Sequence, residues 1–141
     1  MSEEILCTAR TRDELAKCFA EEVAKQYKSH LEFWQATAVD DREEYEMWGV
    51  RMQHEPDTVK ERVLNRIKAV MANPQYHRKY FRKVLKVFVD WDVIRIIPQT
   101  GFYQNLLARD ITHAFPINVE YLINLKTMTV AKIIHSERVH L

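Results

Sequence analysis

Between residues 15 and 34, apolar side chains recur at intervals of three and four, and this spacing constrains the fold more than any other feature. Thr11 and Glu14 precede the repeat and have the spacing of a capping box, in which each end residue satisfies a backbone N–H of the first turn. We therefore predict a helix of about seven turns that ends near Ala38. Its apolar row is Leu15, Cys18, Phe19, Val23, Tyr27, Leu31 and Trp34.

More helices are predicted in the first two-thirds of the chain. Two glycines and four prolines are few for a fold rich in tight turns, so long helices with simple connections are favoured. We predict one helix from Asp41 to about Gln53, followed by a break around Pro56. A second capping box, Thr58 with Glu61, opens the next helix, whose inward row is Val59, Val63, Ile67, Val70 and Met71. Asn73 with Pro74 starts another helix that runs to about Lys86.

Beyond Lys86 the sequence indicates strands. Phe88–Ile97 is rich in β-branched and aromatic residues, and Asp92–Ile97 is typical of a strand that stops at Pro98. Periodicity does not place the change from helix to strand within residues 84–91.

A short helix over Phe102–Asp110 and two more strands complete the predicted elements. Ile117–Asn124 and Met128–His135 alternate apolar and polar residues around Leu125–Thr127, as a half-buried antiparallel hairpin does. Together the elements predict one α+β domain over residues 1–141: about four N-terminal helices, then a small antiparallel sheet of about three strands with one short helix between them. Residues 1–10 could be flexible, residues 11–87 are helical and residues 88–141 are mixed.

Cysteine usage and hydropathy bear on the compartment. Cys7 and Cys18 do not have C-x-x-C spacing, so we predict no metal site and no disulfide, with Cys18 a reduced, buried thiol on the first helix. The acidic N-terminus lacks the basic region of a secretory signal, and no apolar run reaches the roughly 18 residues that span a bilayer. These features predict a cytoplasmic protein that neither enters a membrane nor carries a cofactor.

A net charge of +1 conceals three unlike segments. Residues 1–57 carry seven basic and fourteen acidic residues, whereas residues 58–86 carry nine basic residues against one acid. Residues 87–141 are balanced, with five of each sign. Such blocks indicate where a charged partner, or another part of the same fold, would lie. The acidic and basic blocks of two copies could also pair and form a homodimer.

The basic block contains the residues that we predict to bind a partner. On a helix, residues four apart lie on one face, so Arg78, Arg82 and Lys86 would form one row beside Lys79 and Lys83. Arg62 and Arg66 would give the preceding helix its own basic row. The alternative is that these residues are the solvated face of amphipathic helices, or are covered by acids of the same chain. We call the seven residues the basic ridge.

Trp91 is a further candidate contact, because it stands between Asp90 and Asp92 at a junction and Trp often anchors interfaces. A buried plug of the core is the alternative for this indole. The acidic run Asp40–Glu46 could dock a basic partner, but acids at the start of a helix favour its dipole and the structural explanation is preferred.

The sequence therefore predicts a non-enzymatic regulatory or adaptor module that binds an acidic protein surface through the basic ridge. The alternative is a nucleic-acid-binding protein that uses the same residues, although no motif of a known nucleic-acid module accompanies them. A third hypothesis is a small metal-independent nuclease in which Arg109 binds a phosphate and His113, four residues later, transfers a proton. We assign no catalytic residue and no metal ligand.

Overall fold

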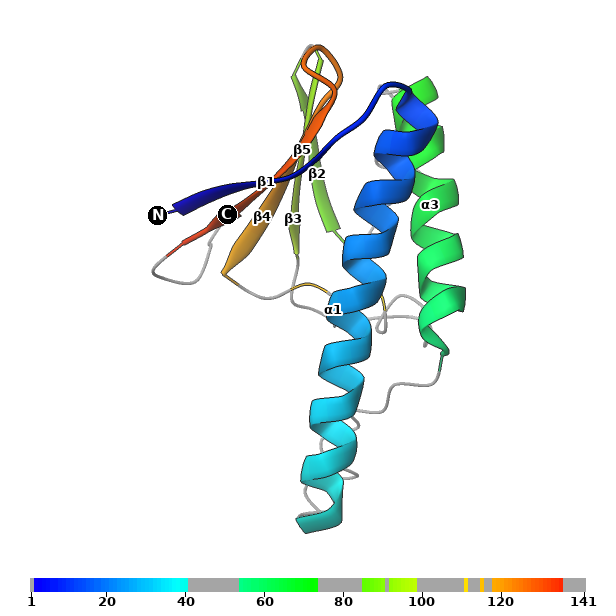
Figure 1. Cartoon of the computed structure of the whole chain (residues 1–141), viewed down its shortest axis with the longest axis vertical. Coiled ribbons are helices and arrows are strands. Elements are labelled where there is room, and N and C mark those ends of the chain that lie inside the picture. Colours follow the sequence, from blue (N-terminus) through cyan, green and yellow to red (C-terminus); the bar gives the residue numbers. More distant parts are fainter. Residues whose placement is uncertain are drawn as a thin grey trace.

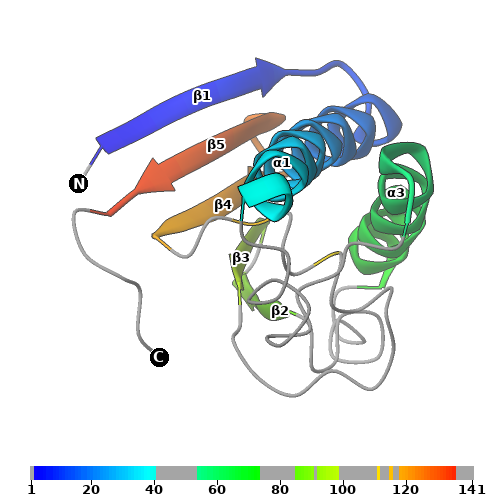
Figure 2. The ribbon, with the colours of Figure 1, turned by 90° about the horizontal axis from the view of Figure 1, so that it is seen from below.

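The computed structural model describes residues 2–40, 54–73, 85–90, 92–98, 111, 115 and 118–135. In this part of the chain, five antiparallel strands form one sheet in the order β1-β5-β4-β3-β2. Helices α1 and α3 lie side by side on the same side of the sheet (Figure 1 and Figure 2). The elements in chain order are β1 (Ser2–Thr8), α1 (Arg12–Asp40), α3 (Pro56–Ala72), β2 (Leu85–Asp90), β3 (Val93–Pro98), β4 (Val119–Asn124) and β5 (Thr129–Ile134).

Helix α1 begins where the capping box predicts. The Glu14 N–H donates to Thr11 Oγ1 at 3.1 Å, and the Glu14 carboxylate accepts from the backbone N–H of Arg10. The first bond satisfies a donor that the first turn leaves without a helical partner, and the second ties the residue before the N-cap to the same turn. Four residues of the predicted row are fully buried: Leu15, Phe19, Val23 and Tyr27. Cys18 and Leu31 are partly buried against the core, and the side chain of Trp34 lies outside the described part.

Helix α3 confirms the predicted buried row but begins earlier than the sequence suggested. Pro56 is its first residue, and the N-cap Glu55 makes no side-chain capping bond, so Thr58 is not the cap. Proline suits this position because its fixed φ is helical and its missing N–H would have no partner there. The predicted break around Pro56 is therefore a helix start. Val59, Val63, Ile67, Val70 and Met71 are buried as expected.

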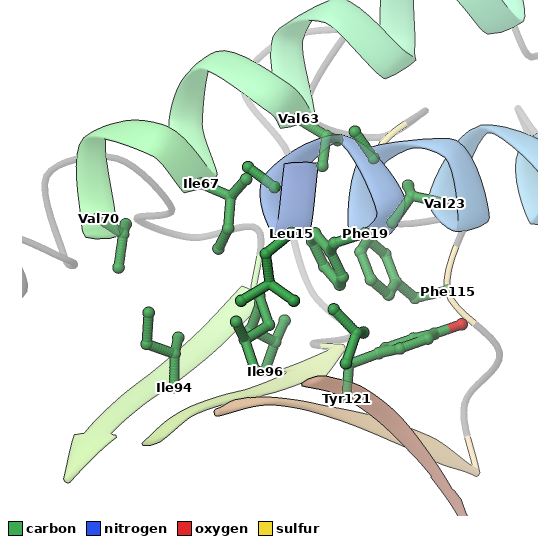
Figure 3. Close-up of a cluster of buried hydrophobic side chains, with 14 of the residues drawn as sticks. Leu15, Phe19, Val23, Val63, Ile67, Val70, Ile94, Ile96, Phe115 and Tyr121 are labelled. Atoms are coloured by element: carbon green, nitrogen blue, oxygen red, sulfur yellow. The ribbon is translucent and has the colours of Figure 1, made fainter. Parts of the chain in front are cut away.

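The core fills the space between the two helices and the inner face of the sheet (Figure 3). Ile94, Ile96, Tyr121, Ile123 and Val130 supply its floor from β3, β4 and β5. Tyr121 meets Phe19 and Phe115 edge to face, with ring centroids 5.5 and 5.6 Å apart. Edge-to-face pairs are a favoured aromatic geometry, so the contact between Phe19 and Tyr121 stabilises the packing of α1 on β4.

The predicted fold class is wrong in the order and number of its elements. A strand precedes the helices, the described residues hold two helices, and the sheet has five strands where about three were expected. The described part still combines helices with an antiparallel sheet, as α+β domains do. The predicted helices Asp41–Gln53 and Phe102–Asp110 lie outside the described residues.

The backbone is already extended at residue 85, inside the stretch that periodicity left open. Leu85 and Lys86, predicted as the end of a helix, belong to β2 instead, and β2 pairs with β3 in a hairpin. Val87 and Phe88 follow in the same strand, and β-branched and aromatic residues favour the extended backbone. Residues 74–84 of that predicted helix lie outside the described part.

The C-terminal hairpin is confirmed. β4 and β5 pair from Val119 with Ile134 to Asn124 with Thr129, and residues 125–128 form the turn between them. The Asn124 side-chain oxygen accepts from the backbone N–H groups of Lys126 and Thr127, at 2.9 and 3.0 Å. An asparagine that bonds its own following backbone in this way favours a turn.

The N-terminal segment forms the edge strand β1, which the sequence did not reveal. β1 pairs antiparallel with β5, and its register shifts between Ile5 and Cys7. Cys7 forms a disulfide with Cys18 of α1, across a Cα separation of 6.7 Å. The prediction of reduced thiols is therefore wrong, and the bridge ties the edge strand to the first helix.

Candidate functional site

Two residues of the basic ridge, Arg62 and Arg66, lie in the described part, both on α3. Arg78, Lys79, Arg82 and Lys83 lie outside it, as does Trp91. Lys86 lies in β2, with its Cα opposite that of Ile97. The predicted row of Arg78, Arg82 and Lys86 along one helix is therefore wrong at Lys86, because its backbone is extended there.

Arg62 and Arg66 stand one helical turn apart. Arg62 is exposed and Arg66 is partly buried. Burial, and then the positive charge of Arg62, lower the pKa of Arg66. Two like charges at this spacing oppose each other by a few tenths of a kcal/mol, so the pair is set up to gain from a negative charge.

The Arg66 guanidinium has unused hydrogen-bonding capacity. Its Nη1 is buried, and within the described part of the chain it has no hydrogen-bond partner. A buried donor without a partner costs about 1–3 kcal/mol, and a charged donor costs more. An anionic group that reached Arg66 would remove that cost and bond to Arg62 as well.

Two other cations of α3 and α1 have partners within the fold. Lys60 of α3 lies 3.6 Å from Glu21 of α1, which agrees with the alternative that the acidic segment covers part of the basic one. Arg12 Nη1 donates to the carbonyl oxygen of Met71 at 3.4 Å, near the C-terminal end of α3. A cation is favourable at that end of a helix dipole. No described acid pairs with Arg62 or Arg66.

A second charged group, missed by the sequence analysis, surrounds Glu120. The Glu120 side chain is 5% exposed, contacts Arg95 of β3, and lies 3.0 Å from His135 Nε2. Alternation along β4 correctly turns Glu120 away from the helices, but it does not reveal that the carboxylate is buried. The backbone N–H of His135 donates to the carbonyl oxygen of Asn118, the residue before β4, at 2.8 Å. The three partners are far apart in sequence, so no local pattern predicts them.

The described residues contain no group of three or more His, Cys, Asp or Glu side chains that could hold a metal ion. None of the helices in the described ranges is long and apolar enough to cross a membrane. Arg109 and His113, the residues of the nuclease hypothesis, both lie outside the described part.

Comparison with known proteins gives no match: no family model, no curated protein and no solved structure is similar to this chain.

Proposed function

We propose that this protein is a non-enzymatic module that binds the acidic surface of another protein through a basic face that begins with Arg62 and Arg66 on α3. The observation that carries the proposal is the unpartnered Nη1 of Arg66, one helical turn from the exposed Arg62. Arginine suits this role because its planar donors match carboxylate geometry. The residues Arg78, Lys79, Arg82 and Lys83 extend the same basic segment along the chain.

A nucleic acid is the alternative occupant, since phosphates also pair with arginine. The absence of a nucleic-acid-binding motif in the sequence favours the acidic protein. The two are separable by salt. Binding to duplex DNA falls with a log–log slope of about −0.9 for each phosphate contact, because counterions are released.

The cytoplasmic location that we expected has lost part of its support. It rested on reduced cysteines, whereas Cys7 and Cys18 are joined by a disulfide. Disulfides persist mainly in oxidising compartments. Binding through Arg62 and Arg66 does not depend on the compartment, because arginine is charged in all of them.

The test is a titration of the purified protein with fluorescently labelled poly-L-glutamate and with labelled single- and double-stranded oligonucleotides, at low and at physiological salt. We expect saturable binding of poly-L-glutamate at physiological salt and weaker binding of the oligonucleotides. The variant Arg62→Gln/Arg66→Gln should lose most of this binding. Its matched control is Lys126→Gln, which removes an exposed charge in the β4–β5 turn.

The outcomes separate the possibilities. If an oligonucleotide bound more tightly than poly-L-glutamate, and its binding fell steeply with salt, the partner would be a nucleic acid and not an acidic protein. Equal binding by the double variant and the wild type would remove α3 from the interface. A molecular mass that doubles with protein concentration, and halves in the double variant, would identify a second copy of this chain as the acidic partner.

A further inference from the structure

A cluster of polar side chains lies between α1 and the sheet, on elements that carry neither Arg62 nor Arg66. Tyr121 of β4 and Lys132 of β5 are directly paired across the two strands. Since Tyr121 belongs to the core, its partner Lys132 also points toward the helices. There Lys132 Nζ lies 3.9 Å from Glu22 Oε1 of α1. The three side chains thus converge from three elements.

Much of the hydrogen-bonding capacity of this cluster is unused. The Tyr121 hydroxyl is buried, and among the described residues it has no partner. The 3.9 Å between Lys132 and Glu22 is an ion-pair distance, too long for a hydrogen bond. Gln26 Nε2 donates to Glu22 Oε1 at 3.0 Å, and no described residue donates to Oε2. The Tyr121 hydroxyl and Glu22 Oε2 therefore have no hydrogen-bond partner among the described residues, and Lys132 Nζ has only its ion pair with Glu22.

The Tyr121 hydroxyl is a donor at physiological pH. Burial, and then the negative charge of Glu22, raise its pKa above the ordinary 10.0. Native proteins rarely leave a buried hydroxyl without a partner, because the lost hydrogen bonds with water cost about 1–3 kcal/mol. Figure 3 shows the hydroxyl directed away from the labelled apolar side chains.

The charges of the cluster determine which ligand fits. Lys132 and Glu22 carry opposite charges. A carboxylate that approached Lys132 would therefore be repelled by Glu22, and an amine that approached Glu22 would be repelled by Lys132. A carbonyl oxygen can accept from Tyr121 and Lys132, while a neighbouring N–H donates to Glu22 Oε2. Phe115 packs against the Tyr121 ring and offers an apolar wall for the rest of the molecule. The side chains of Lys132 and Glu22 are 16% and 14% exposed, so the charged side of the cluster reaches solvent.

We propose that Tyr121, Lys132 and Glu22 form a binding site for a small uncharged molecule that presents a carbonyl oxygen beside an N–H, as a primary amide does. This site is independent of the basic face on α3.

The experiment is a titration of the wild-type protein with benzamide, followed by ¹H–¹⁵N NMR, with benzoate as the charged comparator. We expect the amide signals of β4 and β5 around Tyr121 and Lys132 to shift saturably with benzamide, and benzoate to bind more weakly. Tyr121→Phe removes the hydroxyl and keeps the ring, so it should weaken benzamide binding about tenfold. Lys132→Met should weaken it similarly, and the control Lys126→Met should not.

Three results would overturn the proposal. One is no saturable shift with benzamide, which would leave the Tyr121 hydroxyl to an internal water. Another is unchanged affinity in both Tyr121→Phe and Lys132→Met. The third is a Tyr121→Phe variant that melts several degrees below the wild type, because the hydroxyl would then have a partner inside the folded protein.

Discussion

Arg66 and Glu120 are both charged groups withdrawn from solvent, yet their surroundings differ. Glu120, on the far face of the sheet, is met by Arg95 of β3 and by His135, the residue after β5. Arg66, on α3, has a second arginine as its charged neighbour, and its Nη1 has no partner in the described part of the chain. The charge of Glu120 is balanced inside the fold, whereas that of Arg66 is not.

The difference indicates which polar groups stabilise the protein and which are available for binding. A buried charge with partners from several strands holds those strands in register, and its loss should reduce stability. A charge that the fold leaves unbalanced contributes little to stability and gains from an external ligand. By the same reasoning, the Cys7–Cys18 bridge stabilises the fold, and the unpartnered hydroxyl of Tyr121 is available for binding.

The largest effect is expected from opening the disulfide. Reduction, or the variant Cys7→Ala/Cys18→Ala, should lower the free energy of unfolding by about 3 kcal/mol, since the bridge closes a loop of moderate length. Urea unfolding with and without reductant measures the change, and the double variant should not respond to reductant. Thiol labelling of the unreduced, unfolded protein would contradict the bridge.

Glu120→Gln should lower the free energy of unfolding by about 2 kcal/mol. The change removes the negative charge that Arg95 and His135 face, and the partial exposure of both partners keeps the loss below that of a fully buried pair. Urea unfolding beside the exposed control Glu3→Gln of β1 measures it. If both variants were equally stable, Glu120 would not hold the strands together.

Alkaline pH should destabilise the protein through Tyr121. Its pKa is raised in the folded state, so its contribution is complete below the unfolded value of 10.0 and declines as pH rises above it. The loss is about 1 kcal/mol for each pH unit above that value. Urea unfolding from about pH 9 to about pH 12 should show a shallower decline in Tyr121→Phe. Parallel declines in the two proteins would contradict the burial of the hydroxyl.

Arg66→Met should change the free energy of unfolding least, by about 1 kcal/mol and in the stabilising direction. Methionine keeps the apolar stem and removes the unpartnered donor and the repulsion by Arg62. The same variant should bind poly-L-glutamate more weakly. A loss of stability as large as that of Glu120→Gln would mean that Arg66 is a structural residue.

The sequence predicted those elements whose patterns lie within one short stretch of the chain. The spacing of Leu15, Phe19 and Val23 and the Thr11–Glu14 capping box predicted α1, and alternation predicted the β4–β5 hairpin. β1 escaped because a polar start and the irregularity between Ile5 and Cys7 interrupt its alternation.

The charged clusters show a different limit. The partners of Glu120 come from β3 and from the residue after β5, and Tyr121 meets Glu22 from α1. Such contacts depend on strand register and helix placement, which no short stretch of sequence encodes. Arg62 and Arg66 were identified because one helix brings them together.

The most direct measurement is NMR of the arginine side chains during a titration with poly-L-glutamate. The account predicts saturable shifts of the guanidinium signals of Arg62 and Arg66, while those of Arg95 stay in place because Glu120 already occupies it. Shifts confined to Arg95, with Arg66 unmoved, would contradict the claim that the unbalanced charge on α3 is the binding surface.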